Sequence, residues 1–230
     1  MTLQAKVAAA VLLERIQDEF SPATLASSLG AEDMVLTDLI AKYAPGIGVF
    51  TLDTGRLNPE TYELLAQVQQ SYGAGLEQPI RVYYPDAATI QSFVENNGVN
   101  AFYNRVDLRK ACCGIRKVEP LCRALVGHKA WITGLRRSQS VTRASMPEQE
   151  WDADHGLEKF NPLADWSEKE IWQYIRDNGV PYNKLHDQHY PSIGCAPCTR
   201  AIAMGEDIRA GRWWWEDTSG KECGLHVKKI

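Results

Sequence analysis

Five of the six cysteines in this chain are placed where they could do chemistry. Cys112 and Cys113 are adjacent, Cys195 and Cys198 form a CxxC pair much later in the chain, and Cys223 lies alone near the carboxyl end. The CxxC spacing lets two thiolates bind one metal or cluster, but it also occurs in redox pairs and structural zinc sites. We therefore take the two pairs as candidate ligands and Cys223 as a candidate nucleophile.

The residues alone leave two alternatives for the metal that such ligands would bind. Adjacent Cα atoms such as those of Cys112 and Cys113 lie only ~3.8 Å apart, so their thiolates reach separate irons of a cubane more naturally than they share one small ion. Four thiolates from two distant segments suit an iron–sulfur cluster. Zinc is the main alternative, either on the four cysteines or on a second set. That second set is His186, His189, Cys195 and Cys198.

The two remaining cysteines have different contexts. Cys223 lies in a polar segment with Lys221 and His226 nearby in sequence, which favours a reactive thiolate. The alternative is an inert terminal cysteine. Cys122 stands apart from every pair, and we interpret it as a buried small residue. Cys112 and Cys113 could be interpreted in the same way.

Three segments are candidate anion sites. The turn Ser27–Gly30 precedes a predicted helix, whose first backbone N–H groups and positive dipole end would face a bound phosphate. Alone this is a weak signal, because Glu32 and Asp33 can equally cap the helix. A second polar turn, residues 53–55, follows the next predicted strand, and the loop 135–143 is rich in arginine and hydroxyl groups.

The elements that must position these residues alternate between strand and helix. We expect strands at 24–27, 48–52, 80–84 and 129–133, and helices at 31–43, 59–72 and 87–97. This alternation predicts an α/β fold with an open, mostly parallel sheet and helices on both faces, with ligands at the carboxyl ends of the strands. Ser167 and Glu170 form a capping-box pattern that begins a further helix.

Length and composition bound the function. The 230 residues predict one α/β domain over 1–212, which contains the candidate anion and metal sites, and a mobile tail over 213–230 that carries Cys223. The hydrophobic fraction of 44% is that of a soluble protein without a membrane segment, and we expect a cytoplasmic location, where thiols stay reduced. A net charge of −4 argues against nucleic-acid binding, whereas arginines late in the chain favour a small anion.

Several motifs together resemble one enzyme family. They are SSLGAEDMVL, LDTGRLNPETYEL, CCGIRKVEPL, WITGLRRSQSVTR, YPSIGCAPCTRAI and KECGLH. In this order and spacing they closely resemble the assimilatory adenylyl-sulfate (APS) reductases of the phosphoadenylyl-sulfate (PAPS) reductase family. The likeness covers nearly the whole chain.

This resemblance implies an adenine nucleotide α-hydrolase-like fold related to the pyrophosphatase-loop enzymes. It implies a [4Fe-4S] cluster on Cys112, Cys113, Cys195 and Cys198, and Cys223 as the nucleophile that attacks adenosine 5′-phosphosulfate. AMP would leave, and thioredoxin or a glutaredoxin-like reductant would release sulfite from the S-sulfocysteine. A homo-oligomer is also implied.

The resemblance further implies substrate contacts. Nucleotide contacts would come from Ser27, Ser28, Leu29, Gly30, Leu52 and Gly134, and phosphosulfate contacts from Lys117, Arg143, Arg209 and Arg212. The chain departs from many relatives by having Ser-Ser-Leu-Gly in place of Ser-Phe-Ser-Gly, which puts side-chain contacts at this turn in doubt. It also has Arg109 where some relatives have histidine, and we assign Arg109 no catalytic role.

Two other functions compete with APS reduction. One is reduction of PAPS, alone or alongside APS; PAPS-specific relatives usually lack the two cysteine pairs. The other, from a different class, is a zinc-stabilised nucleotide-binding protein without redox activity.

Overall fold

The computed structural model describes residues 3–139 and 143–216 of the chain. Seven α-helices and six β-strands are assigned among these residues. The helices are α1 (Leu3–Glu19), α2 (Ala31–Tyr43), α3 (Pro59–Tyr72), α4 (Ala87–Asn97), α5 (Val106–Cys113), α6 (Glu119–Leu125) and α7 (Glu168–Asn178). The strands are β1 (Ala23–Ser27), β2 (Gly48–Leu52), β3 (Arg81–Tyr83), β4 (Ala130–Ile132), β5 (Gln149–Asp152) and β6 (Leu157–Phe160).

The strands form one sheet, within the described residues, in the order β3-β2-β1-β4-β6-β5. β1 pairs in parallel with β2 and β4, and β4 in parallel with β6, whereas β5 and β6 form an antiparallel hairpin. The expected α/β fold with an open, mostly parallel sheet is therefore confirmed. Among the described residues, no helix is both long and apolar enough to cross a bilayer.

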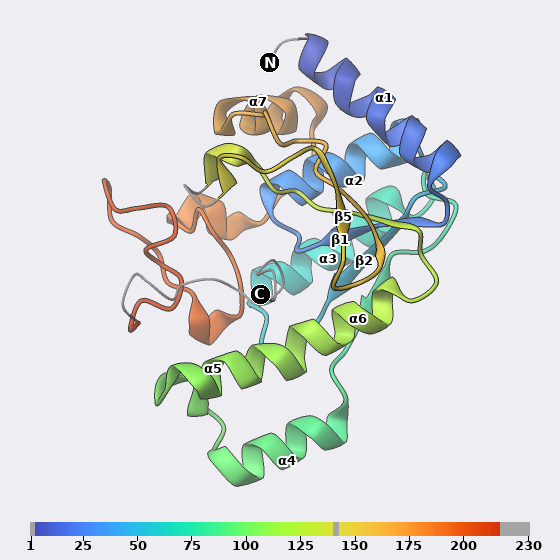
Figure 1. Ribbon diagram of the computed structural model, residues 1–230. Coiled ribbons are helices and arrows are strands. Elements are labelled where there is room, and N and C mark those ends of the chain that lie inside the picture. Colours follow the sequence, from blue (N-terminus) through green and yellow to red (C-terminus); the bar gives the residue numbers. More distant parts are fainter. Residues whose placement is uncertain (1–2, 140–142, 217–230) are drawn as a thin grey trace. The chain divides into compact units, whose positions relative to one another are not determined.

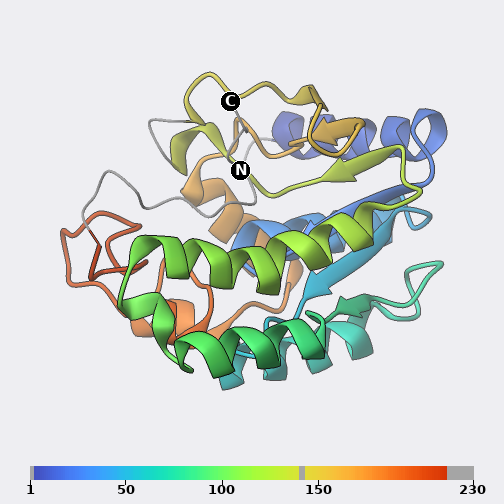
Figure 2. The same cartoon turned by 60° about the horizontal axis from the view of Figure 1, so that its bottom comes forward.

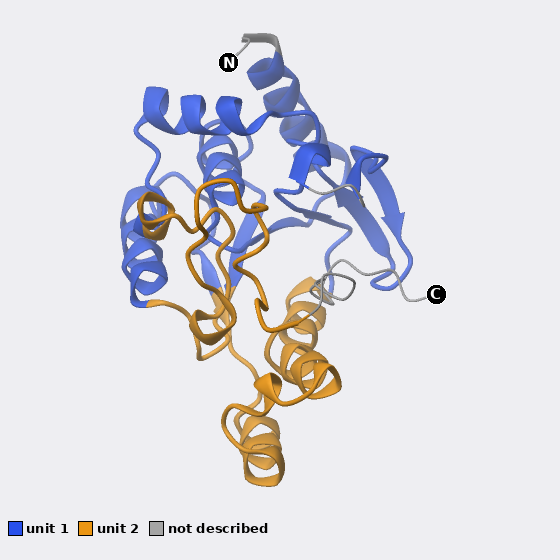
Figure 3. Ribbon diagram, turned by 90° about the vertical axis from the view of Figure 1, so that its left-hand side faces the viewer, with its two compact units in different colours: residues 1–51, 59–81, 127–184 blue, residues 52–58, 82–126, 185–230 orange. Residues whose placement is uncertain are grey.

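Contacts within the chain divide it into two compact units (Figure 3). Unit 1 comprises residues 1–51, 59–81 and 127–184, and unit 2 comprises residues 52–58, 82–126 and 185–230. The sequence instead predicted one domain over 1–212 with a tail from 213. That boundary remains a prediction, but Trp213, at the start of the predicted tail, is only 1% exposed.

The core of unit 1 forms around β1 and α2. Leu25 of β1 is fully buried, as are Met34, Leu36 and Leu39 of α2, as expected for a parallel sheet covered by helices. α2 packs against β1 and also contacts α1 and α7, which Figure 1 shows beside it. This packing fixes the amino-terminal end of α2 next to the turn that follows β1.

α7 begins as its sequence predicts. The Ser167 side chain accepts a hydrogen bond from the Glu170 backbone N–H, and the Glu170 side chain accepts one from the Ser167 N–H. This capping box satisfies orphan N–H groups of the first turn. The helix ends at Gly179, which has the left-handed conformation (φ 62°) that glycine adopts without steric cost.

In unit 2, α5 and α6 lie along one continuous helical path that includes a π-helical turn, Gly114–Val118 (Figures 1 and 2). α4 contacts this turn. Single π turns inside α-helices often mark functional sites, because the wider turn changes which side chains share a face. Here the turn directly follows Cys113.

Candidate functional site

The two cysteine pairs come from different kinds of local structure within unit 2. Cys112 and Cys113 are the last residues of α5, and both are partly buried. Cys195 precedes a 3₁₀ turn, Ala196–Cys198, and both cysteines of this pair are buried at 9% exposure. No disulfide forms among these four cysteines, which are all free thiols.

One cavity of unit 2 brings all four thiols together. It is lined by both cysteine pairs and by four cations, with an apolar wall formed by Phe102 and Pro197. The cations are Arg56, Arg109, Arg116 and Lys117. Of the predicted phosphosulfate residues, Lys117 therefore lies with the cysteines, and its charge favours the anionic form of the buried Cys198 thiol.

The turn after β2 holds the CxxC segment in place. Thr54 Oγ1 lies 3.3 Å from Cys195 Sγ, and the Ala196 N–H donates to the Arg56 carbonyl at 2.8 Å. Arg116 in turn donates from Nη1 to the Thr54 carbonyl at 2.6 Å. Both cysteine segments are thus tied to the same turn.

Burial makes two of these thiols, those of Cys112 and Cys198, hard to ionise. It raises the pKa of the Cys198 thiol to about 12, an effect that the neighbouring Cys195 reinforces and that Lys117 and Arg212 oppose. Burial also raises the pKa of Cys112, and Arg116 opposes this shift. Because metal ligands must be thiolates, binding would release protons, and the nearby cations would compensate the resulting negative charge.

The donor set consists of four free thiols around one cavity, which fits a group bound by four thiolates. Among residues 3–139 and 143–216, no group of three or more His, Cys, Asp or Glu side chains is arranged to hold one metal ion. Four thiols nevertheless line one cavity. Since each iron of a cubane takes one cysteine thiolate, four separated sulfurs around a shared space match that geometry.

The predicted nucleotide turn lies in unit 1, between β1 and α2. Asp33 Oδ2 accepts hydrogen bonds from the Ser28 N–H and hydroxyl, both at 2.6 Å, and Ser27 Oγ accepts from the Leu29 N–H at 3.2 Å. Leu29 has a positive φ of 60°, which is strained for a β-carbon residue and persists only where the surroundings enforce it. Burial raises the pKa of Asp33 to about 6, although its bonds to Ser28 lower it.

Gly134 lies directly against the start of α2. A β-carbon at position 134 would lie 2.3 Å from Asp33 Oδ1 and 2.9 Å from Glu32 Cβ. Only glycine fits this approach. Gly134 is therefore linked to the predicted turn Ser27–Gly30 through Asp33, whose other carboxylate oxygen holds Ser28. Nucleotide binding by these residues remains a prediction.

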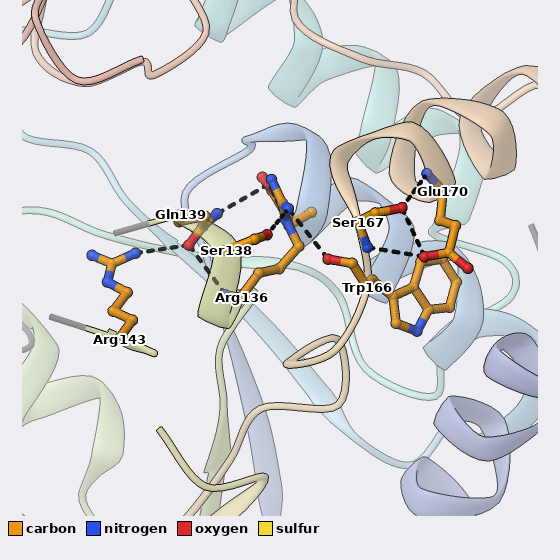
Figure 4. Close-up of polar contacts among 8 residues, drawn as sticks. Arg136, Ser138, Gln139, Arg143, Trp166, Ser167 and Glu170 are labelled. Atoms are coloured by element: carbon orange, nitrogen blue, oxygen red, sulfur yellow. Dashed lines mark hydrogen bonds and ion pairs between the residues drawn. The ribbon is translucent and has the colours of Figure 1, made fainter. Parts of the chain in front are cut away.

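Arg143 is linked to the same region by hydrogen bonds (Figure 4). Its Nη1 donates to Gln139 Oε1 at 2.7 Å, and Gln139 Nε2 donates to Glu32 Oε1 at 3.0 Å. Arg136 pairs with the same Glu32 oxygen at 2.8 Å. Gln139 thus joins Arg143 to the first turn of α2.

Other arginines of the predicted anion loop have protein partners. Arg136 also donates to Ser138 Oγ and to the Trp166 carbonyl, and Arg137 pairs with Asp165.

In unit 2, Arg212 is 7% exposed and donates to the Ile193 carbonyl at 3.1 Å. The segment around Arg209 turns back on itself, since the Arg209 N–H donates to Asp207 Oδ1 and the Arg212 N–H to the Arg209 carbonyl.

The remaining predicted residues fall elsewhere. Leu52 ends β2 and belongs to unit 2. Cys223, the predicted nucleophile, lies outside the described residues. Our interpretation of Cys122 as buried is wrong: it is exposed, and the buried residues of α6 are instead Pro120, Leu121, Ala124 and Leu125.

Sequence reasoning missed several residues of both sites. Thr54 was expected only as part of the candidate anion turn 53–55, whereas the structure places its hydroxyl beside Cys195 Sγ. Arg116 stands inside CCGIRK, a motif that carries the family resemblance, but no role was attached to it. Asp33 was considered only as a helix cap. Gln139 and Arg109 act through partners more than a hundred residues away in sequence, which no local pattern reveals.

Comparisons with known proteins show which proteins the chain is similar to. Residues 22–201 match the phosphoadenosine phosphosulfate reductase domain. The adenosine 5′-phosphosulfate reductase of Allochromatium vinosum is 57% identical over 230 residues, which is 100% of this chain and 88% of that protein.

Solved structures show the same fold. The phosphoadenylyl-sulfate reductase of Candida auris, in a phosphate complex, aligns with a TM-score of 0.72 at 28% identity, covering 87% of this chain and 93% of that one. The FMN adenylyltransferase of Candida glabrata aligns with a TM-score of 0.59 at 13% identity, covering 95% of this chain and 76% of that one. The second likeness concerns the fold alone.

Proposed function

The chain belongs to the phosphoadenosine phosphosulfate reductase family, and on this basis we propose that it reduces adenosine 5′-phosphosulfate to sulfite and AMP in sulfate assimilation. The observation within the structure that supports this proposal is the cavity in which four free thiols meet four cations. We infer the substrate from the relatives, because the most similar of those described above is an adenosine 5′-phosphosulfate reductase.

The reaction requires one nucleophilic thiol. The Cys223 thiolate attacks the sulfur of the substrate, a bond forms between Sγ and that sulfur, and the sulfur–oxygen bond to the phosphate breaks. AMP leaves with the electron pair on its phosphate oxygen. The cationic side chains Lys117, Arg143, Arg209 and Arg212 stabilise the negative charge that develops on this oxygen.

The second half of the reaction is thiol exchange. A thiolate of thioredoxin, or of a glutaredoxin-like dithiol protein, attacks Cys223 Sγ, and sulfite leaves with the electron pair of the sulfur–sulfur bond. The second thiol of the partner then resolves the mixed disulfide and restores Cys223. The two electrons that reduce the substrate therefore come from the partner's dithiol.

Cys112, Cys113, Cys195 and Cys198 would hold a [4Fe-4S] cluster. When bound, this group supplies a fixed local charge and links the two cysteine segments, and the chemistry above needs no change in its oxidation state. Lys117 and Arg116 place positive charge beside these thiols. The support for the cluster is the fit of four separated thiols to one cavity.

Ser27, Ser28, Leu29, Gly30, Leu52 and Gly134 would bind the nucleotide. The first turn of α2 carries backbone N–H groups without acceptors in their own helix, and such groups bind phosphate well. Asp33 holds the Ser28 N–H and hydroxyl, so it fixes the turn rather than contacting the anionic substrate. We further propose a cytoplasmic homo-oligomer, on the family resemblance alone.

Turnover on the two candidate substrates tests this function. We expect clear preference for adenosine 5′-phosphosulfate, and preference for its 3′-phosphorylated form would contradict the proposal.

Iron and zinc content of anaerobically purified protein tests the cofactor separately. About four irons per chain are expected, retained in Cys122→Ser and lost in Cys113→Ser, whereas stoichiometric zinc without iron would favour the zinc-stabilised protein.

A further inference from the structure

A buried ion pair joins the helix of the first cysteine pair to the segment that precedes Cys223. Arg109, on α5, donates from Nε to Glu216 Oε1 at 3.0 Å and from Nη2 to Oε2 at 2.8 Å. The two side chains are 1% and 5% exposed. This bidentate geometry is the strongest form of the arginine–carboxylate interaction, and it fixes orientation as well as distance.

The surroundings of this pair are equally fixed. The Arg109 guanidinium lies 4.6 Å from the centre of the Trp213 ring, and that ring is 1% exposed. Trp213 has a positive φ of 42°, and its N–H donates to the Cys198 carbonyl at 3.2 Å. The Glu216 N–H donates to the Trp213 carbonyl at 2.9 Å. Residues 213–216 are therefore connected to both cysteine segments at once.

We propose that the Arg109–Glu216 pair positions Cys223, by anchoring the chain that carries this nucleophile to the wall of the cysteine cavity. Arg109 itself lines that cavity. Both residues act as positioning residues, since they work through the chain rather than on the substrate. The inference rests on the proposed role of Cys223 in the reaction.

Chain length gives the anchor its effect. Cys223 follows Glu216 by seven positions, and seven residues span at most about 25 Å. A fixed Glu216 therefore sets an upper limit on the distance between this ion pair and the Cys223 thiol, and such a limit raises the effective concentration of the thiol at the cavity. Without the ion pair, the limit would be counted from a residue earlier in the chain and would be larger.

A physical reason favours this positioning role of the buried ion pair over a purely stabilising one. Desolvation offsets much of the energy of such a pair, and a well-packed apolar pair is often as stable. What the bidentate pair adds is one defined position of the two chain segments relative to each other. Here those segments are 107 positions apart.

The test is the single-turnover rate at which Cys223 gains sulfonate from adenosine 5′-phosphosulfate, followed by mass spectrometry. Glu216→Gln keeps the shape of the side chain but removes its charge, and we expect the saturated rate to fall about tenfold or more. AMP affinity and iron content should stay unchanged. Asp107→Asn is the matched control, because it breaks an exposed ion pair with Arg105 on the same helix and should leave the rate unaltered.

Arg109→Lys is a second variant that tests the same interaction if Glu216→Gln does not fold. It keeps the positive charge and loses only the bidentate hydrogen bonding of the guanidinium. In the double variant the two losses should not add, since both remove the same interaction. An unchanged rate in both single variants, or fully additive losses, would overturn the inference. So would a loss of iron and AMP affinity in parallel with the rate in both. If the wild-type protein forms no adduct, the proposed function fails instead.

Discussion

The carboxylate of Asp33 occupies the space that any side chain at position 134 would need. A β-carbon there would lie 2.3 Å from Asp33 Oδ1 and 3.2 Å from the Asp33 backbone nitrogen. Asp33 cannot easily move, because its other oxygen holds Ser28. The β4 loop and the first turn of α2 are thus fitted to each other at the predicted nucleotide site.

Gly134→Ala should therefore displace the turn between β1 and α2. We expect AMP affinity to fall at least tenfold, with a loss of about 1–3 kcal/mol in unfolding free energy from overpacking. Calorimetric titration and denaturant unfolding measure the two effects. Gly48→Ala is the control, because its β-carbon would meet Thr24 Oγ1 at an ordinary 3.5 Å. Wild-type AMP affinity in Gly134→Ala would contradict this account of the site.

Asp33 should make stability fall as pH rises. Burial raises the pKa of Asp33 from 3.8 to about 6, so the folded protein binds this proton more tightly than the unfolded chain does. The resulting stabilisation is complete below the unfolded pKa and is lost as pH rises through about 6.

Asp33→Asn removes this titration. Between about pH 4 and pH 7 the unfolding free energy of the wild type should decrease relative to the variant by on the order of 2–3 kcal/mol. Denaturant unfolding at several pH values measures the difference. A constant difference, or one that grows with pH, would show that Asp33 is not the buried acid described here.

Gln139 should affect substrate binding through Arg143. Gln139→Ala removes an acceptor of the Arg143 guanidinium and a donor to Glu32, so Arg143 loses its hydrogen-bonded link to the first turn of α2. We expect KM for adenosine 5′-phosphosulfate to rise about tenfold, the equivalent of one hydrogen bond to a charged group, with a smaller change in kcat. Gln149→Ala is the matched control, because the exposed Gln149 side chain also accepts a hydrogen bond from an arginine, Arg15. Equal KM values in the two variants would refute the link.

Thr54 should protect the cluster through Cys195. Its hydroxyl lies 3.3 Å from Cys195 Sγ and would donate to the thiolate form. Thr54→Val keeps the shape and removes this bond, so iron should be lost to a chelator about tenfold faster. In Thr199→Val the lost bond is to the Cys195 carbonyl, so a smaller effect is expected. Similar rates in both variants would mean that the sulfur contact has no special role.

Most of the sheet and its helices could be predicted, and three helices show the reason. Helices at 31–43, 59–72 and 87–97 were expected and have those bounds in the structure. Their long apolar periodicity leaves little ambiguity. The hairpin of β5 and β6 was not predicted, because each strand has only four residues, of which three in β5 and two in β6 are charged or amide-bearing.

The sites were predictable only where spacing itself carries chemistry. The cysteine pairs stand out in the sequence, and the structure brings all four into one cavity. Arg109 does not stand out, because its partner Glu216 is 107 positions away and its burial depends on the packing of Trp213. Such pairings follow from tertiary structure and leave no local pattern.

The central claim is that four cysteines hold the cofactor while Cys223 takes the sulfonate. Mass spectrometry of the protein after mixing with adenosine 5′-phosphosulfate, without reductant, tests it most directly. The account predicts one added sulfonate, located on Cys223 and released as sulfite when thioredoxin is added. No adduct, or an adduct on Cys112, Cys113, Cys195 or Cys198, would contradict it.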